Sequence, residues 1–403
     1  MDAKNIGATI AFLRKKRGMT QLELAQKLNV SSKAVSKWEN GQGYPDITLF
    51  PLLSALFGVS LDFLMLQKKG ITVAGNMLVD IVKQIYHYPE PGTLATVSSM
   101  SQAVGGCAPN TAINLAKIDP SLPVSVCGSI GMDDNGRYLL TELQKNGVNV
   151  DRVCSHPQVA TSFSDVMSVP GGERTFFHQK GANAVFSPSD VVIPDLNCDI
   201  FHIGYILLLE RFDAEDAEYG TAMAKFLHKV QKAGIKTSVD VVTDSSASYA
   251  KKILPVLPYC NYIIVNEIEA CSIFGLSSRH KNGTLNRESI RTAMEKMIAS
   301  GVQDKVIIHS KEACFAAAAS SGAITEVASL KIPREEILGN VGAGDAFCAG
   351  ALYALYHGYP DRQLLEFASA AAACNLFAAN SVDGMKPKEE ILQMEQKYGR
   401  LTQ

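Results

Sequence analysis

Residues Gly339–Phe347 have the sequence Gly-Asn-Val-Gly-Ala-Gly-Asp-Ala-Phe and open an apolar helical pattern, Ala343–His357. The first backbone N–H groups of a helix have no partner within it, and the helix dipole favours an anion there. Glycines also let the backbone approach a phosphate closely. A carboxylate at Asp345 would repel that phosphate unless it accepts the proton of an attacking hydroxyl, as phosphoryl transfer requires. The stretch therefore favours a catalytic anion site over a helix start built on glycine packing alone.

The surrounding sequence has no GxxxxGK[ST] motif, which excludes a P-loop nucleotide site. From Ile71 onward, β-rich runs alternate with helical stretches, which is typical of a doubly wound, mostly parallel α/β sheet with helices on both faces. The predicted strands are Ile71–Ala74, Val124–Cys127, Ile200–Ile203, Thr237–Val241, Tyr262–Val265 and Val306–His309. The predicted helices are Asn110–Ile118, Asn135–Asn146, Ala214–Lys232, Ser289–Ser300 and Ala343–His357.

Two further pairs of β-rich runs interrupt this alternation. They are Ile81–Tyr88 with Leu94–Ser101, and Thr161–Val169 with Arg174–His178. Residues 170–173, Pro-Gly-Gly-Glu, form a turn signal within the second pair. These pairs predict a small antiparallel β-lid over the open end of the main sheet.

The first seventy residues differ from the rest in charge. They carry ten Lys or Arg and five Asp or Glu, although the whole chain has a net charge of −2. A basic head on an acidic body predicts that only the head meets a polyanion. Thr20 and Glu23 have the spacing of a capping box, which marks a helix start. Helical patterns follow one another in this all-α segment at Ile6–Lys16, from Thr20, and at Ser32–Asn40, Ile47–Phe57 and Leu61–Leu66.

The turn at residues 29–31 matches a helix-turn-helix, whose second helix enters the DNA major groove. Residues from about 5 to 66 resemble lambda-repressor-like regulators, most clearly in TQLELAQKLNVSSKAVSKWENGQGYPDI from Thr20. The resemblance implies DNA binding, as a homodimer on a two-fold site, through Gln21, Ser31, Ser32, Lys33, Ser36 and Lys37. It also implies a core at Ala25, Val35 and Trp38 and an ion pair of Arg14 with Glu39. The alternative is a helical bundle that mediates protein contacts and binds no DNA.

The body resembles a second family. Val341–Leu355 (VGAGDAFCAGALYAL) is similar to the C-terminal signature of the ribokinase-like, or PfkB-type, carbohydrate kinases. Gly105–Ala112 (GGCAPNTA) is similar to their N-terminal signature, and the likeness extends from about Ile71 to Pro387. The two resemblances imply a helix-turn-helix domain at residues 1–68 and a kinase domain at residues 71–398. They imply ATP and Mg²⁺ as cofactors and a sugar or sugar-like molecule as partner.

The kinase resemblance implies specific roles. They are a catalytic base at Asp345, an anion hole at Gly342, Ala343 and Gly344, sugar binding at Asp80, Gly106 and Asn110, and Mg²⁺ and phosphate binding through water at Asn266 and Glu269. Carboxylate and amide groups suit both hydroxyl recognition and Mg²⁺. The pair Gly105–Gly106 would be the hinge of the lid. A strand-end turn at Asp80 and an ordinary helix start at Asn266 are the alternatives.

Three positions depart from the family pattern. His309-Ser310-Lys311 replaces a Thr-x-Gly on the nucleotide side, Gly339 replaces an Asp that supports a monovalent cation, and Leu78 replaces an Asn. These departures argue against potassium activation and do not restrict the substrate to ribose. An active kinase coupled to gene regulation is the first hypothesis. The alternatives are a sugar-sensing regulator with a non-catalytic kinase fold, and a nucleoside or pseudouridine kinase.

The remaining features concern the compartment. Nine scattered cysteines form no CxxC pair, and the sequence has no run of eighteen apolar residues and no secretory signal pattern. These features predict a cytoplasmic protein without a membrane partner, whose thiols are buried and form neither disulfides nor a zinc site. His178, His202 and His309 lie in or beside apolar runs, and we expect them to make local hydrogen bonds and not to coordinate a metal.

Overall fold

The computed structural model describes residues 3–59, 61, 64, 69–169, 174–243 and 248–402. The chain divides into two compact units, Met1–Lys69 and Gly70–Gln403. Part of the predicted helix Leu61–Leu66 and the whole predicted turn at 170–173 lie outside the described residues. No described helix combines the length and the apolar character of a membrane span.

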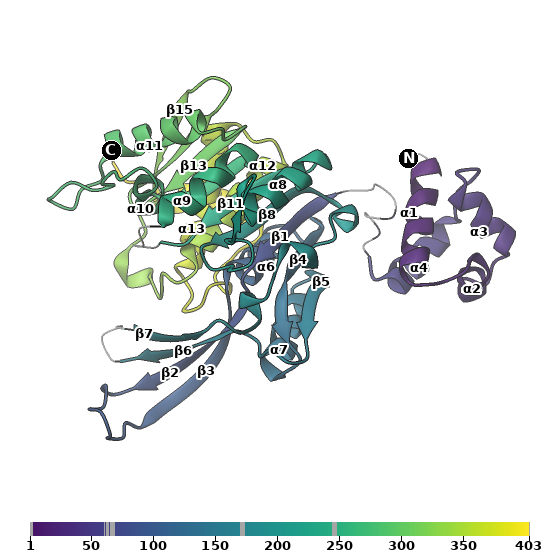
Figure 1. Ribbon diagram of the computed structural model, residues 1–403, viewed down its shortest axis with the longest axis horizontal. Helices are drawn as coiled ribbons and strands as arrows, with labels where there is room; N and C mark the ends of the chain where they lie inside the picture. The colour runs from purple at the N-terminus through teal and green to yellow at the C-terminus, as the bar shows by residue number, and fades with distance from the viewer. Residues whose placement is uncertain are drawn as a thin grey trace. The chain divides into compact units, whose positions relative to one another are not determined.

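The first unit is a helical bundle (Figure 1). Its elements include α1 (Ala3–Lys16), α2 (Gln21–Lys27), α3 (Ser32–Glu39), a 3-10 turn (Ile47–Leu49) and α4 (Phe50–Phe57). The capping box is confirmed, because Thr20 Oγ1 accepts the Glu23 N–H at 3.2 Å and Glu23 Oε2 accepts the Thr20 N–H at 2.7 Å. The predicted core is confirmed as well, since the following side chains are buried: Ala25, Val35 and Trp38.

The second unit is built on a sheet of nine strands among the described residues. In spatial order they are β15 (Ile324–Ala328), β14 (Ala313–Ala318), β13 (Lys305–His309), β12 (Tyr262–Asn266), β11 (Lys236–Val241), β8 (Cys198–Ile206), β1 (Gly70–Gly75), β4 (Val124–Gly131) and β5 (Asn149–His156). Each neighbouring pair from β13 to β5 is parallel, whereas β14 pairs antiparallel with both β13 and β15. The predicted mostly parallel sheet is confirmed, and β5, β14 and β15 extend it beyond the six predicted strands.

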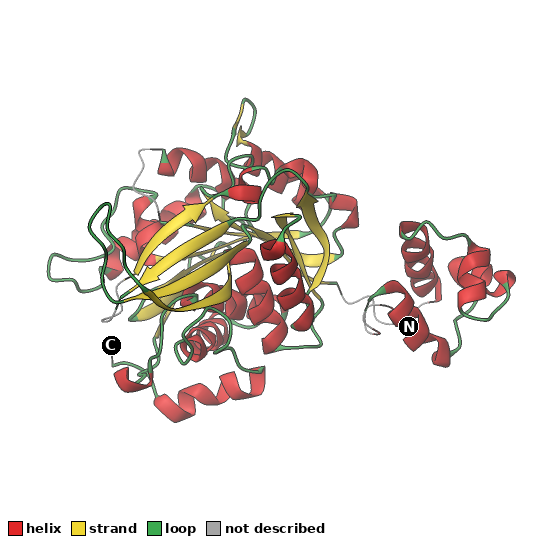
Figure 2. Ribbon diagram, turned by 90° about the horizontal axis from the view of Figure 1, so that it is seen from below, coloured by secondary structure: helices red, strands yellow, loops and turns green. Residues whose placement is uncertain are grey.

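Helices cover both faces of this sheet (Figure 2). One hydrophobic core joins the sheet to α6 (Cys107–Ile118), α7 (Asp134–Lys145), α12 (Ala343–Tyr356), α13 (Asp361–Asn375) and α14 (Lys388–Tyr398). The other joins it to α8 (Ala222–Lys232), α9 (Tyr249–Ile253), α10 (Glu267–Ser272) and α11 (Arg287–Ala299). Successive strand residues face opposite sides. In β12, for example, Ile264 belongs to the first core, and Ile263 and Val265 belong to the second.

A smaller sheet projects from this unit (Figure 1). Its described strands, in spatial order, are β3 (Val97–Gly105), β2 (Leu78–Ile85), β6 (Phe163–Ser168) and β7 (Arg174–Gln179). The predicted β-lid is confirmed, with β2 and β6 paired in parallel and the outer pairs antiparallel. Asn183 holds the loop that enters the lid, because its Oδ1 accepts the Met77 N–H at 2.9 Å and its Nδ2 donates to Met77 O at 3.0 Å.

The predicted helix Ala214–Lys232 is wrong in its first part. The helix α8 begins only at Ala222, after a short hairpin of β9 (Glu215–Asp216) and β10 (Gly220–Thr221). The Asp216 carboxylate accepts two backbone N–H groups of the turn, each at 3.0 Å, and the Thr221 side chain caps α8. Short polar side chains that bond to the backbone therefore override the helical periodicity here.

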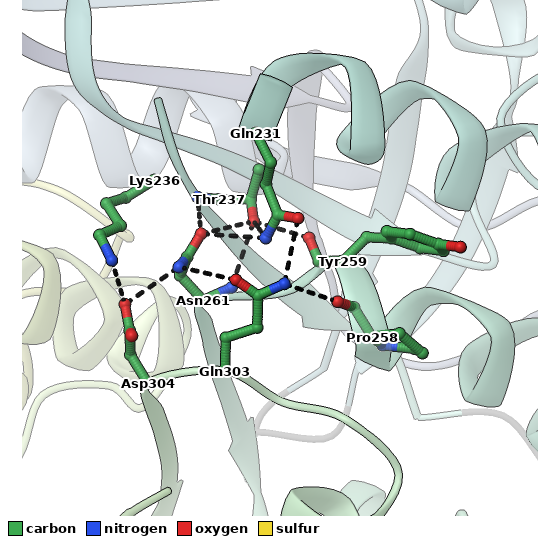
Figure 3. Close-up of polar contacts among 8 residues, drawn as sticks. All are labelled: Gln231, Lys236, Thr237, Pro258, Tyr259, Asn261, Gln303 and Asp304. Carbon is green, nitrogen blue, oxygen red and sulfur yellow. Dashed lines mark hydrogen bonds and ion pairs between the residues drawn. The ribbon is translucent and has the colours of Figure 1, made fainter. Parts of the chain in front are cut away.

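The amide side chain of Asn261 connects the amino ends of the central strands (Figure 3). Its Oδ1 accepts the Thr237 N–H of β11 at 2.9 Å and Nε2 of Gln231 in α8 at 3.1 Å. Its Nδ2 donates to Oδ2 of Asp304, just before β13, at 3.0 Å. Asn261 is buried, and a buried polar group without partners costs free energy. This network therefore stabilises the sheet at the edge opposite the carboxyl ends of the strands.

We expect Asn261→Ala to lower the free energy of unfolding of the second unit by about 2 kcal/mol, because several donors and acceptors lose their partner. Circular dichroism during urea unfolding measures this change. Trp38, the one tryptophan in the sequence, reports the first unit separately by fluorescence. The control is Gln303→Ala, an exposed member of the same network, which should cost less than about 0.5 kcal/mol. Equal effects of the two substitutions would contradict this account of the network.

Candidate active site

A cavity of about 200 Å³ opens at the carboxyl ends of the parallel strands, where open α/β sheets usually bind ligands. Residues at or near the ends of β8, β11, β12 and β13 line it, together with the first turns of α10 and α12. Of the predicted kinase-site residues, its described lining includes Asn266, Glu269, Gly344 and Asp345. It also includes polar side chains outside the prediction: Tyr205, Asp240, Thr243, His309 and Cys348.

Asp345 lies in the first turn of α12 and has 5% of its surface exposed. Asn110 Nδ2 of α6 donates to its Oδ2 at 2.8 Å, and the Tyr205 hydroxyl of β8 donates to its Oδ1 at 2.7 Å. Burial raises the pKa of Asp345 to about 7, the bonds from Tyr205 and Asn110 lower it, and the charge of Asp240 raises it. A general base is most effective with a pKa near the operating pH, so Asp345 has the environment of a base.

The amino end of α12 is open to an anion, because no side chain caps it. Gly342 has φ +78°, and a β-carbon there would lie 2.4 Å from Ser381 Cβ, so a larger residue is excluded twice over. Asn375 Nδ2 fixes the preceding loop by donating to Val341 O at 2.7 Å. The first N–H groups of a helix have no internal acceptor, which suits the predicted anion hole at Gly342, Ala343 and Gly344.

The pair Gly105–Gly106 lies where the lid strand β3 meets α6. A β-carbon at Gly105 would lie 2.6 Å from Asp80 Oδ2, and one at Gly106, where φ is +89°, would lie 2.4 Å from Asn76 O. Asn76 Oδ1 in turn accepts the Cys107 N–H at 3.1 Å. The two glycines therefore permit close backbone approach at the base of the lid, beside the half-buried Asp80.

Asn266 and Glu269 form a capping box at the start of α10. Asn266 Oδ1 accepts the Glu269 N–H at 2.8 Å, and Glu269 Oε2 accepts the Asn266 N–H at 2.9 Å. Glu269 Oε1 accepts the Thr243 hydroxyl at 3.0 Å, and burial raises the pKa of Glu269 to about 7. The helix-start explanation is thus realised in the structure, and the same two side chains face the cavity. Carboxylate oxygens with one hydrogen bond each retain lone pairs for metal-bound water.

His309 is the first residue of the stretch at 309–311 that departs from the Thr-x-Gly of the family pattern. Its ring centroid lies 4.7 Å from that of Phe347, and burial lowers its pKa to about 4, so the ring is neutral at pH 7. The expected local hydrogen bonds are confirmed for the other two histidines. His178 Nδ1 lies 3.0 Å from Ser164 Oγ, and His202 Nδ1 lies 3.0 Å from Ser238 Oγ.

In the first unit, α2 and α3 supply the two helices of the predicted motif, joined by a turn in which Asn29 has φ +54°. The side chains at residues 31–33 and Lys37 are exposed. Some predicted contact residues also bond within the unit: Ser31 caps α3, Ser36 Oγ accepts from Asn40 at 3.4 Å, and Gln21 donates to Glu39 at 2.7 Å. The predicted ion pair is confirmed, since Arg14 binds Glu39 at 2.6 and 2.8 Å.

Tyr205 and Asp240 are the principal site residues outside the sequence prediction. Both are polar residues at the carboxyl ends of strands, β8 and β11 respectively. In a parallel sheet these ends meet at one edge. That rule, applied to every predicted strand, is the signal that could have identified them.

The comparisons with known proteins agree with this geometry. Residues 68–388 match the pfkB family of carbohydrate kinases, so the chain belongs to that family. Residues 10–64 match a helix-turn-helix family. The whole is therefore a carbohydrate kinase of the pfkB family with an N-terminal helix-turn-helix domain.

Individual relatives cover the two units separately. The ribokinase of Schizosaccharomyces pombe is 25% identical over 310 residues, which are 75% of this chain and 91% of that protein. The HTH-type transcriptional activator BcrR of Enterococcus faecalis is 40% identical over 76 residues, 19% of this chain and 37% of that protein. A structure of Arabidopsis thaliana ribokinase complexed with ribose and ATP superposes with a TM-score of 0.66 at 22% identity, covering 81% of this chain and 98% of that one. The ribokinase-like fold of the second unit is thus confirmed.

We expect Tyr205→Phe to move the pH dependence of turnover. With Asp345 as the base that the sequence predicts, the parent should lose activity as the pH falls through about 7, because the protonated carboxyl cannot accept a proton. Without the tyrosine bond, which lowers the pKa of Asp345, the midpoint should rise by about one pH unit. Initial rates from pH 5 to 9 measure it. The control is Tyr353→Phe, which replaces a tyrosine of the same unit that donates to the distant Asp119 carboxylate. Identical profiles for all three proteins would refute this role of Tyr205.

Proposed function

We propose that the second unit transfers a phosphoryl group from ATP to a hydroxymethyl group of a sugar or sugar-like molecule, with Asp345 as the base. The observation that carries the proposal is the position of this carboxylate. It is buried, has a pKa of about 7, and stands in the first turn of a helix that no side chain caps. A proton acceptor beside an anion site is what phosphoryl transfer to an alcohol requires.

Each residue has a defined part in this proposal. Asp345 accepts the proton of the attacking hydroxyl, and the N–H groups of Gly342, Ala343 and Gly344 stabilise the transferred charge. Asn110 orients Asp345 through Nδ2, and its buried Oδ1, which has no partner in the described structure, is free to accept from a sugar hydroxyl. Asp80 and Gly106 bind the sugar at the base of the lid.

The residues present also fit Mg²⁺, which prefers oxygen ligands and retains several waters. Asn266 and Glu269 would hold the ion through water at the cavity wall. When bound, Mg²⁺ neutralises phosphate charge. The protein's own contribution is the oxygen-rich wall and the fixed orientation that the capping box gives to Glu269.

A screen of the purified full-length protein tests the proposal. ADP release is followed with Mg·ATP and a panel of sugars, sugar acids, sugar phosphates and nucleosides. We expect turnover of one compound, and a loss of at least about a hundredfold in kcat for Asp345→Asn, because the variant cannot accept the proton. Asp119→Asn, at the far end of α6 from Asn110, is the control for replacing a buried aspartate. Full turnover by the Asp345→Asn variant would disprove the proposal that Asp345 is the catalytic base.

A second candidate is a regulator whose kinase fold only senses a sugar or nucleotide. The half-buried His309 at the nucleotide side, which is neutral at pH 7, favours it, because this residue adds no positive charge for phosphate. Absence of turnover with every compound of the panel, combined with thermal stabilisation of the protein by one of them, would support the regulator hypothesis. Turnover of a nucleoside in preference to every sugar would instead identify a nucleoside or pseudouridine kinase.

We also propose that the helix-turn-helix domain binds DNA as a homodimer and couples gene regulation to the sugar. The exposed lysines of α3, Lys33 and Lys37, support this proposal, as does the matching motif geometry. Two copies on a two-fold site would supply the affinity that one short recognition helix lacks. The remaining predicted contacts are Gln21, Ser31, Ser32 and Ser36.

Binding to duplex DNA of random sequence should weaken steeply with salt, since lysines displace counterions from phosphates. We expect Lys33→Ala and Lys37→Ala each to reduce the slope of log affinity against log salt by about one. Fluorescence anisotropy with a labelled duplex measures the slopes. Lys232→Ala, an exposed lysine of the kinase unit, should leave the slope unchanged. Absence of binding even at low salt would favour the protein-contact alternative.

A further inference from the structure

Three side chains with metal-ligating atoms meet inside the second unit, next to the cavity. They are His202 of β8, Asp240 of β11 and Cys348 of α12, and α12 packs against β8 in the middle of this unit (Figure 1). His202 Nε2 lies 3.5 Å from Cys348 Sγ and 3.8 Å from Asp240 Oδ2. All three ligand atoms lie within 4.8 Å of one another. The residues are almost wholly buried, with exposures of 0%, 6% and 2%.

These separations suit one ion bound by all three groups. Tetrahedral Zn²⁺ bonds imidazole nitrogen at about 2.0 Å and thiolate sulfur at about 2.3 Å, which places such donors roughly 3.5 Å apart. Nitrogen, sulfur and a single carboxylate oxygen form a donor set for Zn²⁺ or a similar transition metal. Mg²⁺ takes oxygen ligands only, so this cluster differs in chemistry from the wall formed by Asn266 and Glu269.

The surroundings orient the three groups. The 3.0 Å contact between His202 Nδ1 and Ser238 Oγ turns Nε2 toward the cluster, as outer hydrogen bonds do for metal-bound histidines. Asp240 stands at a register shift in the pairing of β11 with β8, and such bulges redirect side chains. A β-carbon at Gly204 would lie 1.8 Å from Asp240 Oδ1, so only glycine leaves room for the carboxylate.

One carboxylate oxygen of the cluster lacks a partner within the described part of the protein. Asp240 Oδ1 is buried and has no hydrogen-bond partner in the described structure. Metal ligands bind as thiolate, carboxylate and neutral imidazole, and binding releases any protons that these groups carry. A divalent ion would balance one carboxylate and one thiolate and would occupy the unused lone pairs.

We propose that His202, Asp240 and Cys348 bind Zn²⁺, with a fourth position open to the cavity beside Asp345. Asp240 and Cys348 both line that cavity, which provides an entry path and room for a water or a ligand atom. The sequence has no spacing motif that predicts this site, because the three residues come from two strands and a helix that are distant in the sequence. The kinase activity proposed above does not depend on it.

Cobalt substitution tests the site directly. The full-length protein is stripped with a chelator and titrated with Co²⁺, and its absorption is recorded. We expect one equivalent to give a thiolate-to-cobalt charge-transfer band together with the intense visible bands of a four-coordinate ion. Added Zn²⁺ should remove both, and excess Mg²⁺ should leave them unchanged. A folded parent that shows no thiolate band contradicts the proposal without any variant.

Variants assign the ligands. Cys348→Ser should abolish the charge-transfer band, whereas Cys260→Ser, which replaces another fully buried cysteine outside the cluster, should retain it. Asp240→Asn should weaken Co²⁺ binding by more than the roughly 10- to 100-fold that loss of an outer partner costs. Circular dichroism verifies folding of each protein. A band that persists in folded Cys348→Ser places the metal on other thiols and overturns the assignment.

Discussion

A carboxylate removed from water must be met by hydrogen-bond donors, and the packing around Asp345 in the kinase unit follows from that requirement. Its two donors come from α6 and β8, through Asn110 and Tyr205. The start of α6 must therefore lie against the start of α12, and the glycines at 105 and 106 let the chain that leads into α6 pass close to Asp80 and Asn76 at the base of the lid. The pKa that results, about 7, is a compromise between burial and these two bonds. With only one of these two bonds, the pKa of Asp345 would be higher, and its carboxyl would stay protonated over more of the physiological pH range.

Stability and chemistry are divided between the two edges of the main sheet. At the amino ends of β11, β12 and β13, Asn261 satisfies every group it faces and holds neighbouring elements together. At the carboxyl ends, Asp240 Oδ1 and Asn110 Oδ1 remain without partners in the described structure. Buried polar atoms in that condition are unfavourable for folding, and these two lie at or beside the cavity, where a ligand could satisfy them.

Local signals in the sequence predicted a large part of this structure. The Thr20–Glu23 box, the lid strands, and the helix that begins with Ala343 each depend on residues close together in the chain, and the structure confirms them. The strand β14 was not predicted because its sequence, ACFAAA, lacks the β-branched residues typical of strands. Its burial and its pairing with both β13 and β15 impose the extended conformation. The contact of Tyr205 with Asp345 joins residues 140 positions apart. The packing of α12 against β8 brings them together, and no local pattern encodes that packing.

The replacement at His309 shows how the site can differ from the family pattern without losing its main constraint. The imidazole is neutral and lies against Phe347, two residues beyond Asp345, so it supports the first turn of α12 by packing and contributes no charge to the anion site. In the proposed mechanism, the backbone N–H groups at residues 342–344 and a divalent cation held by Asn266 and Glu269 would stabilise a bound phosphate. The glycine at 342 cannot be replaced under that division of roles, because its backbone both turns the chain and presents the donors. The side chain at 309 can change, provided that it still fills the space beside Gly344.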